Sequence, residues 1–275
     1  MSDITIKIAD IEIGRKPFII AGPCVIESRP LSLEIAGKLK EFAEKYSINI
    51  IFKASFDKAN RSSIDSYRGP GLERGMEILE EIKRKTSLPV TTDIHLPNQA
   101  KPVSLVVDLI QIPAFLSRQT DLIVAAAQTG IPLNIKKAQF MSPKDMSSVI
   151  KKAESTGNKK IILTERGSCF GYNNLIIDPR SIPIMRQYGY PVILDVTHSL
   201  QQPSVHHSYS GGTPEFIPDI ARLGAALNCD GLFFEVHPNP GKALSDAKTM
   251  LQIDKLPKII LSAKAIWKAV RSENN

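Results

Sequence analysis

The chain has 275 residues, of which 43% are hydrophobic and 23% are charged, and its 35 Lys and Arg against 28 Asp and Glu give a formal net charge of +7. This composition excludes a disordered chain, because enough apolar residues are present to form a large core. The sequence contains neither the roughly 18 consecutive apolar residues of a membrane span nor the pattern of a secretory signal. Its three cysteines, Cys24, Cys169 and Cys229, are too scattered for a disulfide framework, so we expect a cytoplasmic protein.

The basic excess is distributed along the chain. Many Lys and Arg residues stand singly at the ends of apolar runs, and only 6% of residues are aromatic. Nucleic-acid binding favours clustered basic residues with interleaved aromatic side chains, whereas isolated cations suit small anionic substrates. We therefore expect neither nucleic acid nor a membrane as a partner.

The predicted elements alternate between strand and helix. Residues 4–13 alternate like a β-hairpin, and eight short apolar runs rich in β-branched residues follow. The eight expected strands cover residues 18–24, 48–55, 89–95, 109–115, 132–139, 161–167, 191–198 and 231–238. The clearest helical patterns cover residues 32–46, 71–85, 214–227 and 256–270.

Strand followed by helix, eight times in roughly 250 residues, is typical of a (β/α)₈ barrel. A doubly wound sheet is the alternative, but it would need a glycine-rich nucleotide-binding turn after the first strand. The segment AGPCVIES supplies a single glycine there. We therefore predict an α/β fold, with one (β/α)₈ TIM barrel as a single catalytic domain over residues 1–275 and a hairpin in residues 1–16 that caps it.

Each expected strand ends in a side chain that is able to bind or to react. These residues are Cys24, Lys53, Asp93 with His95, Gln111, Lys136, Arg166, His198, and Glu235 with His237. In a barrel, those strand ends converge on one face, where the active site is built. One such residue alone is more often a rim charge or a packing residue, whereas a complete set predicts an active site on this face.

A metal site is one interpretation of four of these positions. Cys24, His198, Glu235 and Asp246 come from the first, seventh and eighth strands and the loop after the eighth. One thiolate, one imidazole and two carboxylates suit Zn²⁺, Fe²⁺ or Mn²⁺. The alternative is that Cys24 is a small buried hydrophobe and Asp246 a helix N-cap. The spacing alone does not decide between them.

A second set of strand-end residues is basic. Its members are Lys53, Lys58, Arg61, Lys136 and Arg166, interspersed with Asn60, Ser62 and Ser63. Several cations with small amide and hydroxyl donors are what phosphate and carboxylate groups require. Since one phosphate would not need five cations, we expect two anionic substrates. The polar stretch 201–216 that follows His198 is typical of a lid or of a plain mobile loop.

The sequence resembles the 3-deoxy-D-manno-octulosonate 8-phosphate synthases from about residue 18 to residue 250. The resemblance lies in the runs GPCVIES, FKASFDKANRSSIDSYRGPGL, TDIH, IQIPAFLSRQTDL, NIKKAQF, TERGSCFGYNNL, DVTHSLQ, FFEVHPNP and ALSDA. It implies a (β/α)₈ barrel, usually a homotetramer, that condenses phosphoenolpyruvate with D-arabinose 5-phosphate in lipopolysaccharide inner-core synthesis. Cys24 and the triplet Ser245-Asp246-Ala247 resemble the metal-dependent branch of that family, which implies a divalent ion (Zn, Fe, Mn or Co).

The resemblance also implies roles for individual residues. Lys53, Lys136 and Arg166 would hold phosphoenolpyruvate, and Lys58 would lie near the reacting centres. The residues implied for the remaining substrate contacts are Asn60, Arg61, Ser62, Asp93, His95 and Gln111, with Arg118 reaching the sugar phosphate of a neighbouring subunit. Cys24, His198, Glu235 and Asp246 would bind the metal. The residues implied for catalysis are Lys58, Lys136, His198 and Asp246.

Two rival functions remain open. The 3-deoxy-heptulosonate 7-phosphate synthases use erythrose 4-phosphate on the same barrel with a similar metal set, but their sugar-phosphate loop is of a Lys-Pro-Arg-Thr type, where this chain has KANRSS at residues 58–63. The other rival is a phosphosugar-binding barrel without catalysis. The complete set of strand-end residues argues against it.

Overall fold

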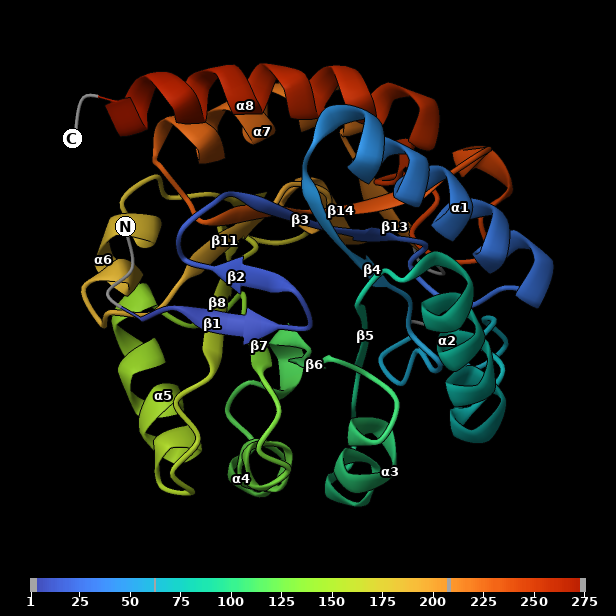
Figure 1. Cartoon of the computed structure of the whole chain (residues 1–275), viewed down its shortest axis with the longest axis horizontal. Coiled ribbons are helices and arrows are strands. Elements are labelled where there is room, and N and C mark those ends of the chain that lie inside the picture. Colours follow the sequence, from blue (N-terminus) through green and yellow to red (C-terminus); the bar gives the residue numbers. More distant parts are fainter. Residues whose placement is uncertain (1–3, 62, 207–208, 273–275) are drawn as a thin grey trace.

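The computed structural model describes residues 4–61, 63–206 and 209–272. Among these residues, eight parallel strands pair in the order β11-β8-β7-β6-β5-β4-β3-β14, and the pairing of β11 with β14 closes the barrel. Helices surround the strands (Figure 1). The prediction of an α/β TIM barrel is therefore confirmed.

All eight expected strands are present, each inside its predicted range. They are β3 (Phe18–Gly22), β4 (Asn49–Lys53), β5 (Val90–Asp93), β6 (Leu109–Ile112), β7 (Leu133–Lys136), β8 (Ile161–Glu165), β11 (Val192–Asp195) and β14 (Gly231–His237). The helices are α1 (Arg29–Tyr46), α2 (Leu72–Thr86), α3 (Ala100–Ser104), α4 (Thr120–Gln128), α5 (Met146–Glu154), α6 (Ser181–Arg186), α7 (Ile217–Ala226) and α8 (Leu256–Ser272). Every residue of each of these strands after the first is buried, which explains why they appear in the sequence as continuous apolar runs.

The predicted N-terminal hairpin is also present. It consists of β1 (Ile6–Ile8) and β2 (Ile11–Ile13), which pair antiparallel and bury alternate isoleucines. Those isoleucines form one apolar cluster with Phe18, Ile51 and Phe233, which start or lie within barrel strands. The hairpin lies across the barrel in Figure 1. It thereby closes the N-terminal end of the barrel with apolar side chains.

The helix α1 begins three residues before its predicted start. Ser28 is its N-cap, its hydroxyl accepts a hydrogen bond from the Leu31 amide at 3.3 Å, and Pro30 occupies the first turn. A serine cap followed by proline is a favoured helix start. None of the helices in the described part of the chain is long and apolar enough to cross a membrane.

Short additional strands extend the loops after three barrel strands, as two antiparallel pairs and one strand parallel to β14. The pairs β9 (Ser168–Cys169) with β10 (Leu175–Ile176) and β12 (Gln201–His206) with β13 (Tyr209–Gly212) follow β8 and β11, and β15 (Leu251–Gln252) pairs with β14. The region expected to be a lid or loop, residues 201–216, therefore contains a hairpin. All three additions follow the C-terminal ends of strands, where the sequence predicts the active site.

Candidate active site and metal centre

A polar cavity of about 300 Å³ opens at the C-terminal ends of the barrel strands. The predicted site residues that line it are Lys53, Lys58, Asn60, Arg61, Asp93, Gln111, Lys136, Arg166, His198 and Asp246. The strands end at this face, so side chains separated by almost 200 residues in the sequence share one cavity. All five cations of the basic set and two members of the metal set, His198 and Asp246, are brought together here.

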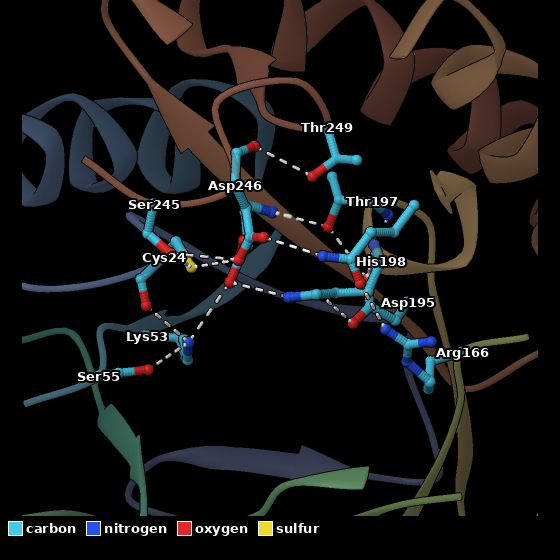
Figure 2. A network of polar contacts seen from close by, with 12 residues as sticks. Cys24, Lys53, Ser55, Arg166, Asp195, Thr197, His198, Ser245, Asp246 and Thr249 are labelled. Carbon is cyan, nitrogen blue, oxygen red and sulfur yellow. Dashed lines mark hydrogen bonds and ion pairs between the residues drawn. The ribbon is translucent and has the colours of Figure 1, made fainter. Parts of the chain in front are cut away.

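The four predicted metal ligands form a compact group. One ligand atom from each of Cys24, His198, Glu235 and Asp246 lies within 4.8 Å of the other three. Cys24 and Glu235 are fully buried, and Oε2 of Glu235 has no hydrogen-bond partner among the residues that the structure describes. Figure 2 shows His198 facing Cys24 and Asp246. The donor set and the free carboxylate oxygen fit a divalent ion, which these four residues would hold.

The protonation state of Cys24 depends on the acidic side chains around it. Its sulfur lies 3.1 Å from Oγ of Ser245 and 2.9 Å from Oδ2 of Asp246, both within range of its one S–H donor. Burial raises the pKa of the thiol well above its ordinary value, and the carboxylates of Asp246 and Glu235 raise it further. Without a cation the group therefore holds a proton, whereas a bound divalent ion would favour the thiolate.

Asp195, at the end of β11, fixes the orientation of His198. Its Oδ2 lies 2.7 Å from Nδ1 of His198, which leaves Nε2 on the side of Glu235, 3.3 Å from that carboxylate. Burial opposes the charge of Asp195, but His198 and Lys136 outweigh it and hold the pKa of Asp195 well below its ordinary value. A carboxylate behind a histidine is the usual support of a metal-binding imidazole.

Lys53 lies between the metal group and the neighbouring strand. Its ammonium donates to the Cys24 carbonyl at 3.1 Å and to Oγ of Ser55 at 2.9 Å, and it lies 3.5 Å from Glu235 and 3.6 Å from Asp93. The side chain is 1% exposed. Lys53 therefore supplies a fixed positive charge at the floor of the cavity.

Two further cations retain donor capacity toward the cavity. Lys136 donates to Oδ2 of Asp195 at 2.6 Å and lies 3.8 Å above the ring of Phe233. Arg166 donates through Nη2 to Gln201 at 3.2 Å, whereas its buried Nη1 finds no acceptor within the described residues. Burial lowers the pKa of both side chains. A bound anion would offset this burial and satisfy the free N–H groups.

Lys58 is a buried cation whose charge interacts with the metal-ligand group. Burial opposes its ammonium, but the combined effect of Cys24, Glu235, Asp93 and Asp246 raises its pKa well above the ordinary value. Its side chain lines the cavity. Lys58 therefore stays protonated beside the group of acidic ligands.

Arg61 joins the predicted sugar-phosphate loop to the loop after β14. Its Nη1 donates to Oγ of Ser245 at 2.7 Å and its Nη2 to the Leu244 carbonyl at 3.2 Å. Asn60 lies beside it at the cavity wall. Ser62, predicted as the third residue of this set, lies outside the described residues.

The remaining predicted contacts differ in position. Gln111 lines the cavity and accepts a hydrogen bond from Asn134 at 3.0 Å. His95 lies 3.8 Å from Asp93, but the described residues that line the cavity include neither His95 nor Arg118. Arg118 is exposed on the loop after β6. Both assignments stay predictions, and the place of Arg118 agrees with a role outside its own barrel.

Asp195 and Gln201 are two further members of the site that were not predicted from the sequence. Gln201 connects the two halves of the cavity, because its Nε2 donates to Asp246 at 2.9 Å while its Oε1 accepts from Arg166. The signal for Asp195 was its position as the last residue of a buried apolar strand, three residues before His198. The sequence contained no comparable signal for Gln201.

A TIM barrel with a cationic cavity and a cluster of metal ligands at its C-terminal end is typical of enzymes that act on phosphorylated substrates. The sequence matches the DAHP synthetase I family over residues 3–271. The chain belongs to that family.

Individual relatives resemble the chain over nearly their whole length. A protein of Desulfatibacillum aliphaticivorans is 52% identical over 94% of this chain and 95% of its own. A protein of Hahella chejuensis is 50% identical over 100% of this chain and 99% of its own, and one of Protochlamydia amoebophila is 51% identical over 98% of both. All three are named 2-dehydro-3-deoxyphosphooctonate aldolase.

Proposed function

We propose that the chain condenses phosphoenolpyruvate with D-arabinose 5-phosphate and water to give 3-deoxy-D-manno-octulosonate 8-phosphate and inorganic phosphate. The observation that carries this proposal is the cavity lined by Lys248 and the five predicted cations, which also contains His198 and Asp246 of the candidate metal-ligand group. The names of the relatives support the same reaction, whereas none of those three names refers to the heptulosonate product of the rival. The product would feed lipopolysaccharide synthesis, and we expect the reaction in the cytoplasm.

The reaction forms one carbon–carbon bond and one carbon–oxygen bond from water, and it breaks the carbon–oxygen bond that joins phosphoenolpyruvate to its phosphate. The methylene carbon of phosphoenolpyruvate attacks the sugar aldehyde, water adds to the adjacent carbon, and phosphate leaves from that carbon. Lys53, Lys136 and Arg166 bind the carboxylate and phosphate, so that the methylene carbon faces the aldehyde. Positioning of this kind lowers the barrier because the two substrates no longer have to find each other in the right orientation.

The sugar phosphate occupies the opposite side of the cavity in this proposal. Asn60, Arg61 and Ser62 bind its phosphate, and Asp93, His95 and Gln111 contribute to the pocket around the sugar. Lys58 stays protonated near the reacting carbons, where it stabilises negative charge that develops on oxygen.

The metal ligands Cys24, His198, Glu235 and Asp246 lie next to the position of the aldehyde. A divalent ion bound there would orient or polarise the aldehyde, or activate water. Asp195 keeps Nε2 of His198 directed toward this group. In this proposal His198 and Asp246 are ligands first, and they also handle protons at the reacting centre.

We further propose that residues 1–275 act as one catalytic unit and that the unit assembles into a homo-oligomer, which we expect to be a tetramer. Phe115, Phe140, Phe170 and Tyr172 are 53–99% exposed on the loops after β6, β7 and β8. Large exposed apolar side chains of this kind favour contact with another protein surface. Arg118 lies on the same loop as Phe115 and would serve the neighbouring cavity. Sedimentation that shows a fully active monomer would contradict this assignment.

The test of the reaction is phosphate release from phosphoenolpyruvate with each sugar phosphate in turn. We expect release with arabinose 5-phosphate to be much faster than with erythrose 4-phosphate. Equal or reversed rates would favour the heptulosonate synthase. Binding of both ligands without any release would favour a barrel that only binds phosphosugars.

A further inference from the structure

Two charged side chains are fully buried on the side of the strands that faces away from the cavity. Lys137 follows Lys136 at the end of β7, and Glu165 precedes Arg166 at the end of β8; they are 0% and 1% exposed. Successive residues of a strand point to opposite faces. Lys136 and Arg166 therefore point into the cavity, while their neighbours Lys137 and Glu165 point into the wall behind it.

Lys137 ties the loops after β7 and β8 together. Its ammonium donates to Oγ of Ser168 at 2.9 Å, to the carbonyls of Ala138 and Met141 at 3.3 Å, and to the carbonyl of Gly167 at 3.5 Å. Two of these acceptors belong to the β7 loop and two to the β8 loop. One buried ammonium therefore sets the distance between the two loops.

Glu165 closes the turn that carries Arg166. Its Oε1 accepts hydrogen bonds from the backbone amides of Arg166 at 2.9 Å and Gly167 at 2.6 Å, and it lies 3.5 Å from the Lys137 ammonium. Gly167 has φ of +90°, a conformation that favours glycine. The carboxylate therefore fixes the backbone of Arg166, and with it the direction in which the Arg166 side chain leaves the strand.

The energetics of this pair argue for a role beyond stability. Burial lowers the pKa of Lys137, and Glu165 opposes that shift. A buried ion pair contributes little net stability compared with apolar side chains of the same shape, because both charges lose their hydration. The pair instead fixes the positions of its neighbours in the chain, Lys136 on β7 and Arg166 after β8.

We infer that Lys137 and Glu165 form a positioning pair that holds Lys136 and Arg166 at the separation required by one small substrate with two anionic groups. The identification of that substrate as phosphoenolpyruvate rests on the proposed function. The pair touches neither substrate. It acts through the backbone of β7 and β8. Among the described residues, its hydrogen bonds and ion pair involve neither Arg61 nor Asn60, which bind the sugar phosphate in the proposal.

The test is the binding of phosphoenolpyruvate alone, measured by titration calorimetry, together with the KM values for both substrates. A misplacement of about 1 Å in a site can lower the reaction rate on the order of 100-fold. We expect a similar loss of interaction with the bound anion, so Lys137→Met should raise the Kd and KM for phosphoenolpyruvate by about 10- to 100-fold. The KM for arabinose 5-phosphate should change by less than about threefold, since the other wall of the cavity is intact.

Asp230→Asn is the matched control. Asp230 is also buried, 1% exposed, and its Oδ2 accepts a hydrogen bond from the Val192 amide at 2.9 Å, at the opposite end of the barrel. This variant should lower the melting temperature without affecting the Kd for phosphoenolpyruvate. Glu165→Gln keeps an acceptor for the two amides and should raise that Kd less than Lys137→Met does. It serves as the test if Lys137→Met does not fold.

The inference would be overturned if folded Lys137→Met or Glu165→Gln bound phosphoenolpyruvate as tightly as the wild type does. It would also be overturned if either variant raised both KM values equally, because a general loosening of the barrel would have that effect in the control as well. Failure of the proposed function is distinguishable, because it would appear in the wild-type protein as absence of phosphate release with arabinose 5-phosphate. The calorimetric comparison of variant with wild type does not require turnover.

Discussion

The two ends of the barrel are made by the same eight strands, but these strands turn different side chains inward at each end. At the N-terminal end the interior is apolar, where Phe18 and Ile51 belong to one cluster with the isoleucines of the hairpin. At the C-terminal end the interior contains buried charges, such as Lys53 beside Glu235 and the pair of Lys136 with Asp195. The change takes place within a few residues along each strand.

This difference shows how stability and chemistry are divided along the strands. Buried charges are costly, because pairing repays the lost hydration only in part. The apolar end and the surrounding helices supply the burial that offsets this cost. Substitutions at the C-terminal end should therefore act on binding and activity, and substitutions at the N-terminal end on stability alone.

The largest expected effect is the loss of the metal-ligand group. Cys24→Ala should abolish bound divalent metal and lower kcat by more than about 100-fold, because a ligand is lost and not merely one of its supports. Metal content is measured by elemental analysis of the purified protein. Dipicolinate should inactivate the wild type, and Mn²⁺, Fe²⁺, Co²⁺ or Zn²⁺ should partly restore it.

Cys229→Ala provides the matched control from the other end of the barrel, since Cys229 is equally buried. It should keep both metal and activity. If Cys24→Ala stayed fully active in the presence of chelator, Cys24 would be a small core residue and the metal proposal would have to be abandoned.

The next effect concerns the sugar-phosphate side of the cavity. Loss of a charge-assisted phosphate contact costs about 1.5–3 kcal/mol, or roughly 10- to 150-fold. Arg61→Ala should therefore raise the KM for arabinose 5-phosphate by that factor. Steady-state kinetics with each substrate varied in turn are the measurement. If the KM for phosphoenolpyruvate rose more than the KM for arabinose 5-phosphate, the assignment of Arg61 to the sugar phosphate would be contradicted.

At the N-terminal end, Ile13→Ala removes a fully buried side chain of the hairpin. Truncations of this kind cost about 2–5 kcal/mol, or a fall in melting temperature of roughly 4–20 °C for a chain of this size. Both KM values and kcat should stay at the wild-type level when measured well below the melting temperature. Leu105→Ala is the control, because Leu105 is 81% exposed and its truncation should have little effect on melting. A reduced kcat in Ile13→Ala would show that the two ends are coupled.

The same contrast explains which features the sequence made predictable. The strands were predictable because both of their faces are buried, which produces continuous apolar runs such as FIIAG in β3. The strand-end residues were predictable because polar groups interrupt those runs at the point where the barrel opens. The earlier start of α1 at Arg29 was missed, since the pattern of apolar residues begins only after the serine cap and the proline.

Contacts made by backbone groups were not predictable. The acceptors of Lys137 are mostly carbonyls of two loops, which no residue type identifies, so nothing in the sequence distinguished Lys137 from an ordinary surface lysine. Gln201 was missed for a related reason, because its partners Arg166 and Asp246 come from other strands and loops. The positions of His95 and Arg118 outside the lining of their own cavity could likewise not be obtained from strand-end spacing.

The smallest expected effect compares the three thiols and leaves activity aside. Cys169 is exposed, whereas Cys24 and Cys229 are buried at opposite ends of the barrel. Burial and the neighbouring Asp230 raise the pKa of Cys229 to about 12, so its thiolate fraction is very small at neutral pH and grows only as the pH approaches that value. Because the thiolate is the reactive form, iodoacetamide should label Cys169 rapidly in the native protein and Cys229 only after unfolding.

The measurement is mass spectrometry of labelled peptides over time, with urea-unfolded protein as the reference in which all three cysteines react. Cys24 should also react slowly, and more slowly still if a divalent ion is bound to its sulfur. Labelling of Cys229 at the rate of Cys169 would mean that the apolar end opens in the native state. Local opening of that kind requires few buried apolar contacts. Trp267, which is 1% exposed, covers Cys229 and donates to its carbonyl at 2.8 Å, so we expect this region to stay closed. Rapid labelling of Cys229 would therefore contradict the contrast between a rigid apolar end and a functional polar end.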